Sequence, residues 1–562
     1  MQELNLSPRA KAIVIAGTML GLLVAAISQT VVSTALPRII GELGGLNLFS
    51  WVFTASMLTS TTVMPLVGKL SDLYGRKPFF IGGIVVFMVT SALSGLSQSM
   101  VQLIVFRGFQ GIGAGMIMAN AFAIIGDLFA PSERGRYMGL FTAVFGLASI
   151  VGPLLGGWIT DNLSWRWVFY VNIPVGVVAL SVLMVGFPWI RPSGTRPPID
   201  HWGVSALVLA VVPLLLALVW AGDLYPWLSP QIAGLLAMSV VGTVAFILVE
   251  RAAADPIMPL GMFSSPVFSV AIMITFLTGM GMFGAITFTP MFIQGALGSS
   301  ATNSGLVTMP MMLGLVVAST TAGQLITRTG RYRVLVVLGG IALAAGMYLM
   351  SRMDEGTAHM VTVRNMIIVG VGLGTSMPIL GLVVQNAMPY RLLGVATSSV
   401  QFFRQIGGTL GIAIFGTLVT THLRDNLRAE LPTEVQALPE PLLERLEDPQ
   451  VLLSPDALDR LREGFAALGA QGAGLFAETI DSMRMVLAEA VTNVFFLGML
   501  VSIAALAVSV FLREIPLRTT VAGEEGARPL PAPPAGEAVS GQVPGIPLAD
   551  PPSAGPPGDE PG

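Results

Sequence analysis

The sequence predicts an all-α polytopic membrane protein with fourteen transmembrane helices, arranged as two six-helix bundles plus two extra helices. Three observations predict this architecture. Of the 562 residues, 53% are hydrophobic and 11% are charged, whereas a soluble domain carries about 25% charged residues. Uncharged intervals long enough to cross a bilayer recur along the chain. A charged stretch with two glycines, "GKLSDLYGRK" (68–77), has a second copy in the other half of the chain.

Intervals without charged residues give the spans in chain order, because a helix needs roughly 20 apolar residues to cross the hydrocarbon core. Ten clear intervals are 12–37, 43–68, 78–106, 137–160, 167–190, 201–222, 224–249, 334–351, 365–390 and 489–512, of which only the last includes a charged residue, Glu489 at its first position. The uncharged interval 256–327 is long enough for two spans, with "GALGSSATNS" (295–304) as their turn, because glycine and serine favour loops. Two more spans, near 101–126 and 397–420, each contain one arginine.

Arginine and lysine are distributed unevenly between the predicted loops, and cytoplasmic loops carry the excess in membrane proteins. With the N-terminus placed in the cytoplasm, the cytoplasmic loops hold most of these cations. The short outer loops hold little beyond Arg38, Arg166 and Arg352. The asymmetry predicts a multi-pass protein with both termini in the cytoplasm, and the family resemblance given below implies a bacterial-type cytoplasmic (inner) membrane.

The spans and loops divide the chain into six segments. They are an N-terminal six-helix bundle (1–190), two linker transmembrane helices (191–255), five helices of the C-terminal bundle (256–421), an extracytoplasmic loop with amphipathic helices (422–486), the last transmembrane helix (487–513) and a disordered cytoplasmic tail (514–562). In the loop, "SPDALDRLREGFAAL" begins with a serine cap followed by proline, which favours a helix start. The tail is dominated by Pro, Gly, Ala and acidic residues, which cannot bury enough apolar surface to pack.

An internal repeat relates the two bundles. "GKLSDLYGRK" (68–77) reappears as "GQLITRTGRY" (323–332), and "RGFQGIGAG" (107–115) is followed in the second half by "RNMIIVGVG" (364–372). This alignment pairs Arg107 with Arg364. A weaker pair is "PSERGR" (131–136) with "PYRLLG" (389–394). Parallel repeats of this kind place the substrate at the midplane between the two halves.

Taken together, these motifs resemble the major facilitator superfamily, specifically its fourteen-helix drug:proton antiporter subfamily (the EmrB/QacA type). Further matching stretches are "GLASIVGPLLGG" (146–157), "SWRWVFYVNIPVG" (164–176) and "QFFRQIGGTLG" (401–411). The match covers about residues 10–420 and the last helix. The resemblance implies the major facilitator fold, and a secondary active transporter that exports hydrophobic or amphipathic compounds by alternating access, with protons as the energy source.

The charged turn after the second span is a candidate conformational latch. Its glycines permit a tight turn and close helix approach, and Asp72 can pair with Arg76 or accept hydrogen bonds from helix-terminal N–H groups. By family analogy Asp127, at the end of the fourth span, lies near this turn. The candidate latch residues are Gly68, Asp72, Gly75, Arg76, Lys77 and Asp127. The alternative is a loop that serves only to orient the chain. Thr327 replaces Asp72 in the second copy, which predicts an asymmetric latch.

Polar residues inside the spans are candidates for substrate binding or proton coupling, because an arginine in mid-bilayer costs about 2.5–3.5 kcal/mol on insertion scales. These candidates are Ser28, Gln29, Thr30, Arg107, Gln110, Arg404 and Gln405. For the arginines the alternative is snorkelling to the membrane surface. Many members of the family carry an acid in the first span, where this chain has Ser28 in "ISQTVVSTALP" (27–37). Any coupling proton is therefore expected on Asp72, on Asp127 or on the substrate.

The fifth span carries the stretch that resembles an antiporter motif. Its candidate hinge residues are Gly146, Gly152, Pro153, Gly156 and Gly157. Two of the glycines are four residues apart, which permits close helix packing, and Pro153 frees the carbonyl of residue 149. Ordinary packing within the membrane would also account for the glycines. The resemblance favours a hinge at the interface of the two bundles.

The function predicted from these features is multidrug efflux of small hydrophobic substrates, with protons and membrane lipid as the other partners and the monomer as the working form. Neither an enzyme nor a nucleic-acid partner is expected, and no cofactor or metal site is predicted. A phosphate-binding loop of the form GxxxxGK[ST] is absent from the sequence, as is cysteine. One alternative is a lipid or lipid-precursor exporter that does not couple through a carboxylate in the first span. Another is a non-transporting membrane sensor or scaffold.

Overall fold

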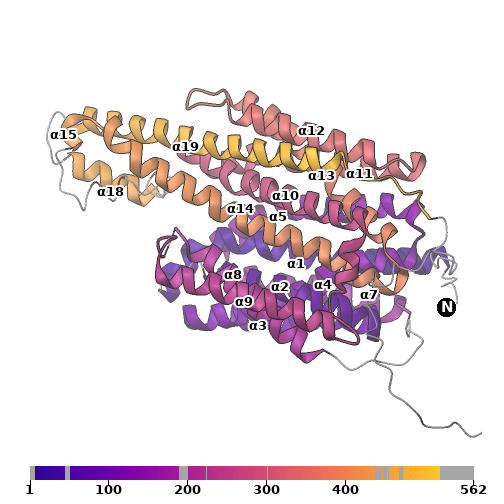
Figure 1. Cartoon of the computed structure of the whole chain (residues 1–562). Coiled ribbons are helices and arrows are strands. Elements are labelled where there is room, and N and C mark those ends of the chain that lie inside the picture. The colour runs from indigo at the N-terminus through magenta and orange to yellow at the C-terminus, as the bar shows by residue number, and fades with distance from the viewer. Residues whose placement is uncertain are drawn as a thin grey trace, which may run out of the picture. The chain divides into compact units, whose positions relative to one another are not determined.

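The computed structural model of the protein describes residues 7–44, 48, 51–188, 200–222, 224–299, 301–436, 443, 446, 452, 455–466 and 472–518. All of them lie in one compact unit, Met1–Gly523. The described residues are almost entirely helical, and the long helices lie side by side, as Figure 1 shows. Residues 519–562 of the expected tail and residues 189–199 lie outside the described residues.

Six spans form the first half of the chain. They are α1 (Pro8–Leu43), α2 (Trp51–Tyr74), α3 (Arg76–Gly95), α4 (Met100–Leu128), α5 (Pro131–Asn162) and a sixth span made of the short α6 (Trp167–Tyr170) with α7 (Asn172–Gly186). The expected linker helices are α8 (His201–Trp220) and α9 (Pro230–Ala252), which pack against each other.

The second half contains six further spans and several short helices. The spans are α10 (Pro266–Met291), continued by the π-turn η3 (Phe292–Ala296), then α11 (Ala301–Thr329), α12 (Arg333–Met350), α13 (His359–Ala387), α14 (Leu393–Glu430) and α19 (Gly472–Ser509). The short elements are η2 (Leu260–Ser264), η4 (Tyr390–Leu392), α15 (Thr433–Gln436) and α18 (Pro455–Ala466).

Thirteen described helices are long and apolar enough to cross a membrane. The remaining span is α2, which has 24 residues and packs along α4. Serine and threonine side chains lower its hydropathy, and many of them are buried and donate to carbonyls one turn earlier, such as Thr61 to Met57 at 2.8 Å. With α2 the structure contains the fourteen spans that the sequence predicts.

Local chemistry sets several helix boundaries. The side chains of Ser7, Ser99, Asp200 and Ser229 accept hydrogen bonds from N–H groups in the first turns of α1, α4, α8 and α9. Such caps satisfy donors that have no partner within the helix. Between α2 and α3 the chain turns at Gly75, whose φ of 97° is a left-handed conformation that favours glycine.

Two of the predicted segment boundaries differ from the structure. The connection predicted over 422–486 is shorter, because α14 continues unbroken to Glu430 and α19 already begins at Gly472. The helix predicted after Ser454 is present within it as α18. Both α14 and α19 extend past the apolar part of their sequences and pack on each other, which keeps these polar turns helical. At the other boundary, residues 514–518 were expected in the tail, but they are described and hydrogen-bonded to the second half.

The glycine positions of the repeat correct the sequence alignment of α4 with α13. A Cβ on Gly113 would lie 2.7 Å from the backbone of α3, and one on Gly372 would lie 2.5 Å from the backbone of α12. Since α3 and α12 are equivalent helices, Gly113 corresponds to Gly372. The alignment predicted from the sequence is therefore wrong by two residues. Arg364, which is exposed, is not the counterpart of Arg107.

Candidate functional site

The two halves meet along two antiparallel seams at one membrane face. We call this face the basic face and define it by the turns Tyr74–Arg76, Leu128–Pro131, Thr329–Arg333 and Ala387–Leu393. One seam joins α2 to α14, and the other joins α5 to α11. Residues that approach each other across these seams come from opposite halves of the chain, so they are the residues able to control whether the halves separate.

The seam between α2 and α14 is closest at a pair of glycines. A Cβ on Gly68 would lie 2.1 Å from the hydroxyl oxygen of Ser398, and one on Gly394 would lie 2.6 Å from the carbonyl oxygen of Gly68. No side chain fits at either position without moving the helices apart. Gly68, a predicted latch residue, therefore lets the backbones of the two halves come into direct contact.

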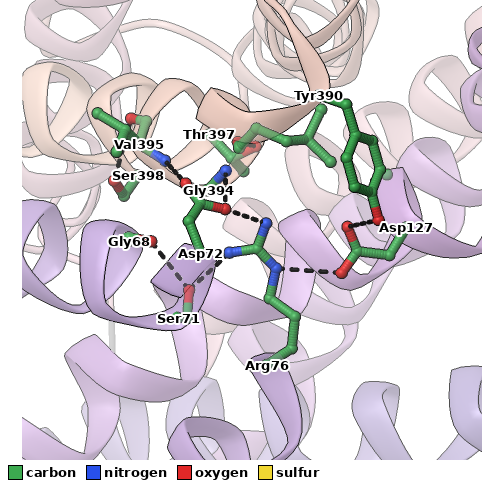
Figure 2. Close-up of polar contacts among 12 residues, drawn as sticks. Gly68, Ser71, Asp72, Arg76, Asp127, Tyr390, Gly394, Val395, Thr397 and Ser398 are labelled. Atoms are coloured by element: carbon green, nitrogen blue, oxygen red, sulfur yellow. Dashed lines mark hydrogen bonds and ion pairs between the residues drawn. The ribbon is translucent and has the colours of Figure 1, made fainter. Parts of the chain in front are cut away.

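The carboxylate of Asp72 lies at the end of this seam and caps α14. Its two oxygens accept hydrogen bonds from the backbone N–H groups of Gly394 and Val395, each at 3.0 Å. The first turn of a helix has free N–H groups and a partial positive charge, both of which stabilise an anion. An acid of the first half thus binds the N-terminus of a helix in the second half, as Figure 2 shows.

Arg76 bridges two carboxylates beneath this cap. Its guanidinium lies 2.5 Å from Asp72 and 3.1 Å from Asp127, and it also donates to the hydroxyl of Ser71. Asp127 accepts a further hydrogen bond from the hydroxyl of Tyr390 at 3.1 Å, which is a second contact across the halves. These side chains are buried or nearly so, and a buried charge is tolerated when it is paired and hydrogen-bonded. We call Asp72, Arg76, Asp127 and Tyr390 the Asp72 cluster.

Arg134, a neighbouring arginine, adds further contacts between the halves at the basic face. Arg134, at the start of α5, is 2% exposed and donates to the carbonyls of Phe129 and Gly126 and to the side chain of Gln385. Gln385 lies in the second half, and its amide donates to the carbonyl of Phe122 in the first half at 3.0 Å. Arg134 is thus not a solvated loop cation but part of the contact between the halves.

The seam between α5 and α11 repeats the glycine geometry without the charges. A Cβ on Gly323 would lie 2.2 Å from the carbonyl oxygen of Gly135, and one on Gly139 would lie 2.4 Å from that of Ser319. The hydroxyl of Thr327 donates to the carbonyl of Gly323 in its own helix and caps nothing in α5. The asymmetry predicted from the sequence is therefore present in the contacts: one seam has a carboxylate cap and the other is neutral.

A short segment after α19 also joins the halves at the basic face. The hydroxyl of Tyr332 donates to the carbonyl of Arg513 and accepts from the N–H of Ile515. Asn386 donates to the carbonyl of Pro516 and accepts from the N–H of Arg518. The carbonyl of Arg518 then accepts from the N–H of Ser132 in the first half at 3.2 Å. Residues 513–518 therefore connect the second half to the start of α5.

The remaining predicted latch residues act within the first half. Gly75 makes the turn into α3, and the ammonium of Lys77 donates to the carbonyls of Met184 and Phe187 at the end of α7. Cations stabilise helix C-termini, so Lys77 fixes the end of α7. Lys69, two turns earlier, pairs with Asp255 in the connection after α9.

The glycines of the predicted hinge in α5 divide between two neighbours. Gly146 faces α11 of the other half, and a Cβ on it would lie 2.5 Å from the side chain of Val316. Gly152 and Gly156 face α1 of the same half, where the hydroxyls of Thr30 and Thr34 fill the space, and Gly157 has nothing within 4 Å. Thr30 donates to the carbonyl of Ala148, close to the kink-prone Pro153. Only Gly146 of this set lies at the interface of the halves.

Arg107 and Gln110 form a polar network inside the first half. Arg107 is 2% exposed and donates to the carbonyl of Val52 and to the side chain of Gln110. Gln110 donates to the hydroxyls of Ser91 and Ser28, at 3.0 and 3.4 Å, so Ser28 faces α4. Within the described residues no carboxylate pairs with Arg107, whose charge is stabilised by carbonyl and amide oxygens alone.

The other intramembrane candidates lie apart from this network. Gln29 is exposed, one position from Ser28, and Ser33 is exposed one turn further along the same face of α1. Arg404 and Gln405 are half-buried on α14, and Arg404 donates to the side chain of Gln401 at 2.6 Å. Among the described residues no group of three or more His, Asp or Glu side chains is placed to hold a metal ion.

Comparison with known proteins agrees with this arrangement of helices. The family model of the Major Facilitator Superfamily matches residues 18–412. The chain is 38% identical to the Multidrug transporter protein MdtP of Bacillus subtilis (strain 168), a match that covers 92% of this chain and 95% of MdtP. It is 36% identical to Multidrug resistance protein 3 of the same organism, over 90% of this chain and 96% of the relative.

Solved structures share the fold at low sequence identity. The human organic anion transporter MFSD10 (TETRAN) matches with a TM-score of 0.56 and 15% identity, over 88% of this chain and 100% of that chain. The match to the family model and the two bacterial relatives show that the chain belongs to the major facilitator superfamily. It is a secondary transporter of the fourteen-span type and not an enzyme, and its two halves correspond to the two six-helix bundles of that fold.

Replacing Asp72 by asparagine is expected to loosen the contact at the basic face, because the amide keeps the size but loses the charge that Arg76 and the α14 terminus stabilise. A single cysteine at Thr142, which is buried between the halves, reports on separation because the chain has no native cysteine. We expect labelling from the basic face to accelerate roughly tenfold, equivalent to ~1.4 kcal/mol. Thr327→Ala, at the equivalent position of the neutral seam, serves as the control and should leave the rate within twofold. Equal rates in Asp72→Asn and its parent would contradict the assignment.

Two truncations test the segment 513–518. A chain ending at Arg518 keeps every contact described above and should transport and label like the full chain. A chain ending at Leu512 loses the Ser132–Arg518 hydrogen bond between the halves, and one such bond contributes about 0.5–1.5 kcal/mol. We expect Thr142→Cys labelling from the basic face to accelerate by roughly two- to tenfold. Loss of activity in the chain ending at Arg518 would show instead that later residues also act.

Proposed function

We propose that this protein exports small hydrophobic or amphipathic compounds across a bacterial cytoplasmic membrane, in exchange for protons, by alternating access. The single observation that carries the proposal is the Asp72 cap on α14, a charged and breakable contact between the two halves. The relatives named for multidrug transport and multidrug resistance support the same substrate class. We infer that the monomer is the working form, with its exposed apolar side chains, such as Val185, facing lipid.

The basic face is the cytoplasmic face in this proposal, because loops rich in arginine and lysine remain in the cytoplasm. Both seams are in contact there, so the structure corresponds to a transporter closed toward the cytoplasm. Gln29 and Ser33 support access from the other side. They are exposed polar side chains on a central helix, and hydrocarbon solvates such groups poorly.

The charges of the Asp72 cluster determine whether protonation strengthens or weakens the contact between the halves. Adding a proton to Asp72 or Asp127 removes a negative charge that Arg76 stabilises, and at Asp72 one that the α14 N-terminus also stabilises. Protonation therefore weakens the contact and favours opening to the cytoplasm. An exporter must return to the cytoplasm-facing state without its substrate, and a proton bound from outside would drive that return. Helix α1 offers Ser28 where many relatives carry an acid, so Asp127 is our first candidate for the coupling group.

Transport in inside-out vesicles tests both export and coupling. Uptake of a hydrophobic dye should require an imposed proton gradient in the unmodified protein. In Asp127→Asn, which keeps the hydrogen bond from Tyr390 but cannot titrate, uphill uptake should fall at least tenfold while exchange of dye down its gradient persists. Asp255→Asn, which removes a carboxylate outside the Asp72 cluster, is the control and should retain uphill uptake. Uptake by the unmodified protein that ignores the proton gradient would favour the lipid-exporter alternative.

The orientation can be measured with one added cysteine. Arg460 is exposed on α18, in the connection between α14 and α19, which the proposal places outside the cell. Arg460→Cys should react in intact cells with a reagent that does not cross membranes. A cysteine at the exposed Arg331, in a turn of the basic face, should react only after permeabilisation. The reverse pattern would invert the topology.

A further inference from the structure

A small cavity lies between the two halves, deeper than the Asp72 cluster. Its volume is about 20 Å³, enough for a single water molecule. Phe122, Met138 and Thr142 line it from the first half, and Met377, Gln401 and Arg404 are among the residues that line it from the second. Because both halves contribute walls, the cavity widens whenever the seams open.

Arg404 is the one charged side chain in this lining, which otherwise consists mainly of apolar groups. Its guanidinium has five N–H donors. Among the described residues its side-chain partner is Gln401, which accepts from one terminal nitrogen at 2.6 Å. No carboxylate lines the cavity, so a permanent cation stands there without a protein counter-charge.

The backbone fixes Arg404 in this position. A Cβ on Gly279 of α10 would lie 2.4 Å from the carbonyl oxygen of Arg404, and a Cβ on Gly407 would lie 2.2 Å from that of Phe276. This close packing prevents α14 from rotating away from the cavity. Arg404 is also eleven residues into α14, which corresponds to about 17 Å of helix rise and places it near the midplane.

The other buried arginines differ from Arg404. Arg76 is paired with two carboxylates. Arg107 and Arg134 are each 2% exposed, and carbonyl and amide oxygens surround them. Arg404 is half-buried and lines a space shared by the halves. An intramembrane arginine is costly, about 2.5–3.5 kcal/mol on insertion scales, and an anion beside it offsets that cost.

We propose that Arg404, oriented by Gln401, binds an anionic group of the transported compound, such as a carboxylate, sulfonate or phosphate. The apolar body of the compound then packs on Phe122, Met138 and Met377, two of which are methionines that adapt to varied shapes. This assignment rests on the proposed export function and narrows its substrate class to amphipathic compounds that carry a negative group.

A matched pair of dyes tests the assignment. Rhodamine 110 has a free carboxylate, and rhodamine 123 is its methyl ester, so the two compounds differ at one group. Binding of each to the purified full-length protein can be measured by fluorescence polarisation. We expect the unmodified protein to bind the acid at least tenfold more tightly than the ester. This comparison requires no variant to fold. Equal affinities for acid and ester would overturn the proposal.

Variants then assign the preference to Arg404. Arg404→Gln should weaken binding of the acid at least tenfold and that of the ester less than twofold. Arg404→Lys keeps the charge without the planar fork, so it should retain part of the preference. Arg107→Gln, the matched arginine away from the cavity, should change both affinities by the same factor. A preference for the acid that survives in Arg404→Gln would overturn the proposal.

Two further measurements distinguish a soluble anion from a lipid phosphate as the ligand, and anion binding from export. Displacement of rhodamine 110 by a soluble short-chain phosphatidylglycerol would identify a lipid phosphate as an occupant of the same anion site, and its failure would leave soluble anions as the ligand class. Uptake of both dyes into inside-out vesicles tests export separately. If the acid binds with the predicted preference but neither dye is taken up, the export function fails and the Arg404 site stands. If both dyes are taken up without any binding preference, the Arg404 site fails and export stands.

Discussion

The carboxylate of Asp72 at the N-terminus of α14 is the interaction around which the contact between the two halves at the basic face is built. It satisfies two backbone donors of one half with an acid of the other, in a buried place where an unpaired group of either kind would be costly. The glycines at positions 68 and 394 allow the helices to come close enough for this contact. Arg76 and Asp127 then hold the carboxylate in place and balance its charge.

The two seams share their shape and differ in their chemistry. Both bring glycine backbones together across the halves, as expected from an internal repeat, but among the described contacts across the seams only those of the α2–α14 seam involve a carboxylate. A neutral seam responds little to protonation, whereas the charged seam weakens when either carboxylate is neutralised. In the proposed export cycle both seams open toward the cytoplasm, and we infer that protonation acts on the charged seam.

Arginines at different depths complete this division of roles. Those near the basic face, Arg76 and Arg134, have their charges satisfied by groups that also join the halves. Arg107 joins four helices within one half, α2 through the carbonyl of Val52 and α1 and α3 through Gln110 and the serines that it reaches. Arg404 alone in this set borders space that both halves enclose. The distribution of partners, and not the residue type, separates structural arginines from one able to meet a ligand.

The sequence by itself determined the spans, the turns, the repeat and the charged glycine turn, because these depend on local hydrophobicity, charge and backbone freedom. It also indicated that Asp72 has no equivalent at Thr327. Only the tertiary structure decided which groups meet. The donors to Asp72 are backbone N–H groups 322 and 323 residues away. Every residue except proline has such a group, so the side-chain pattern could not predict which of them binds Asp72. Lys77 caps α7, and Gly152 and Gly156 face α1. Arg107 has no arginine at the equivalent position of the repeat. The sequence could not predict these partners, because neighbouring positions on a helix face different helices and a shift of two residues changes the partner.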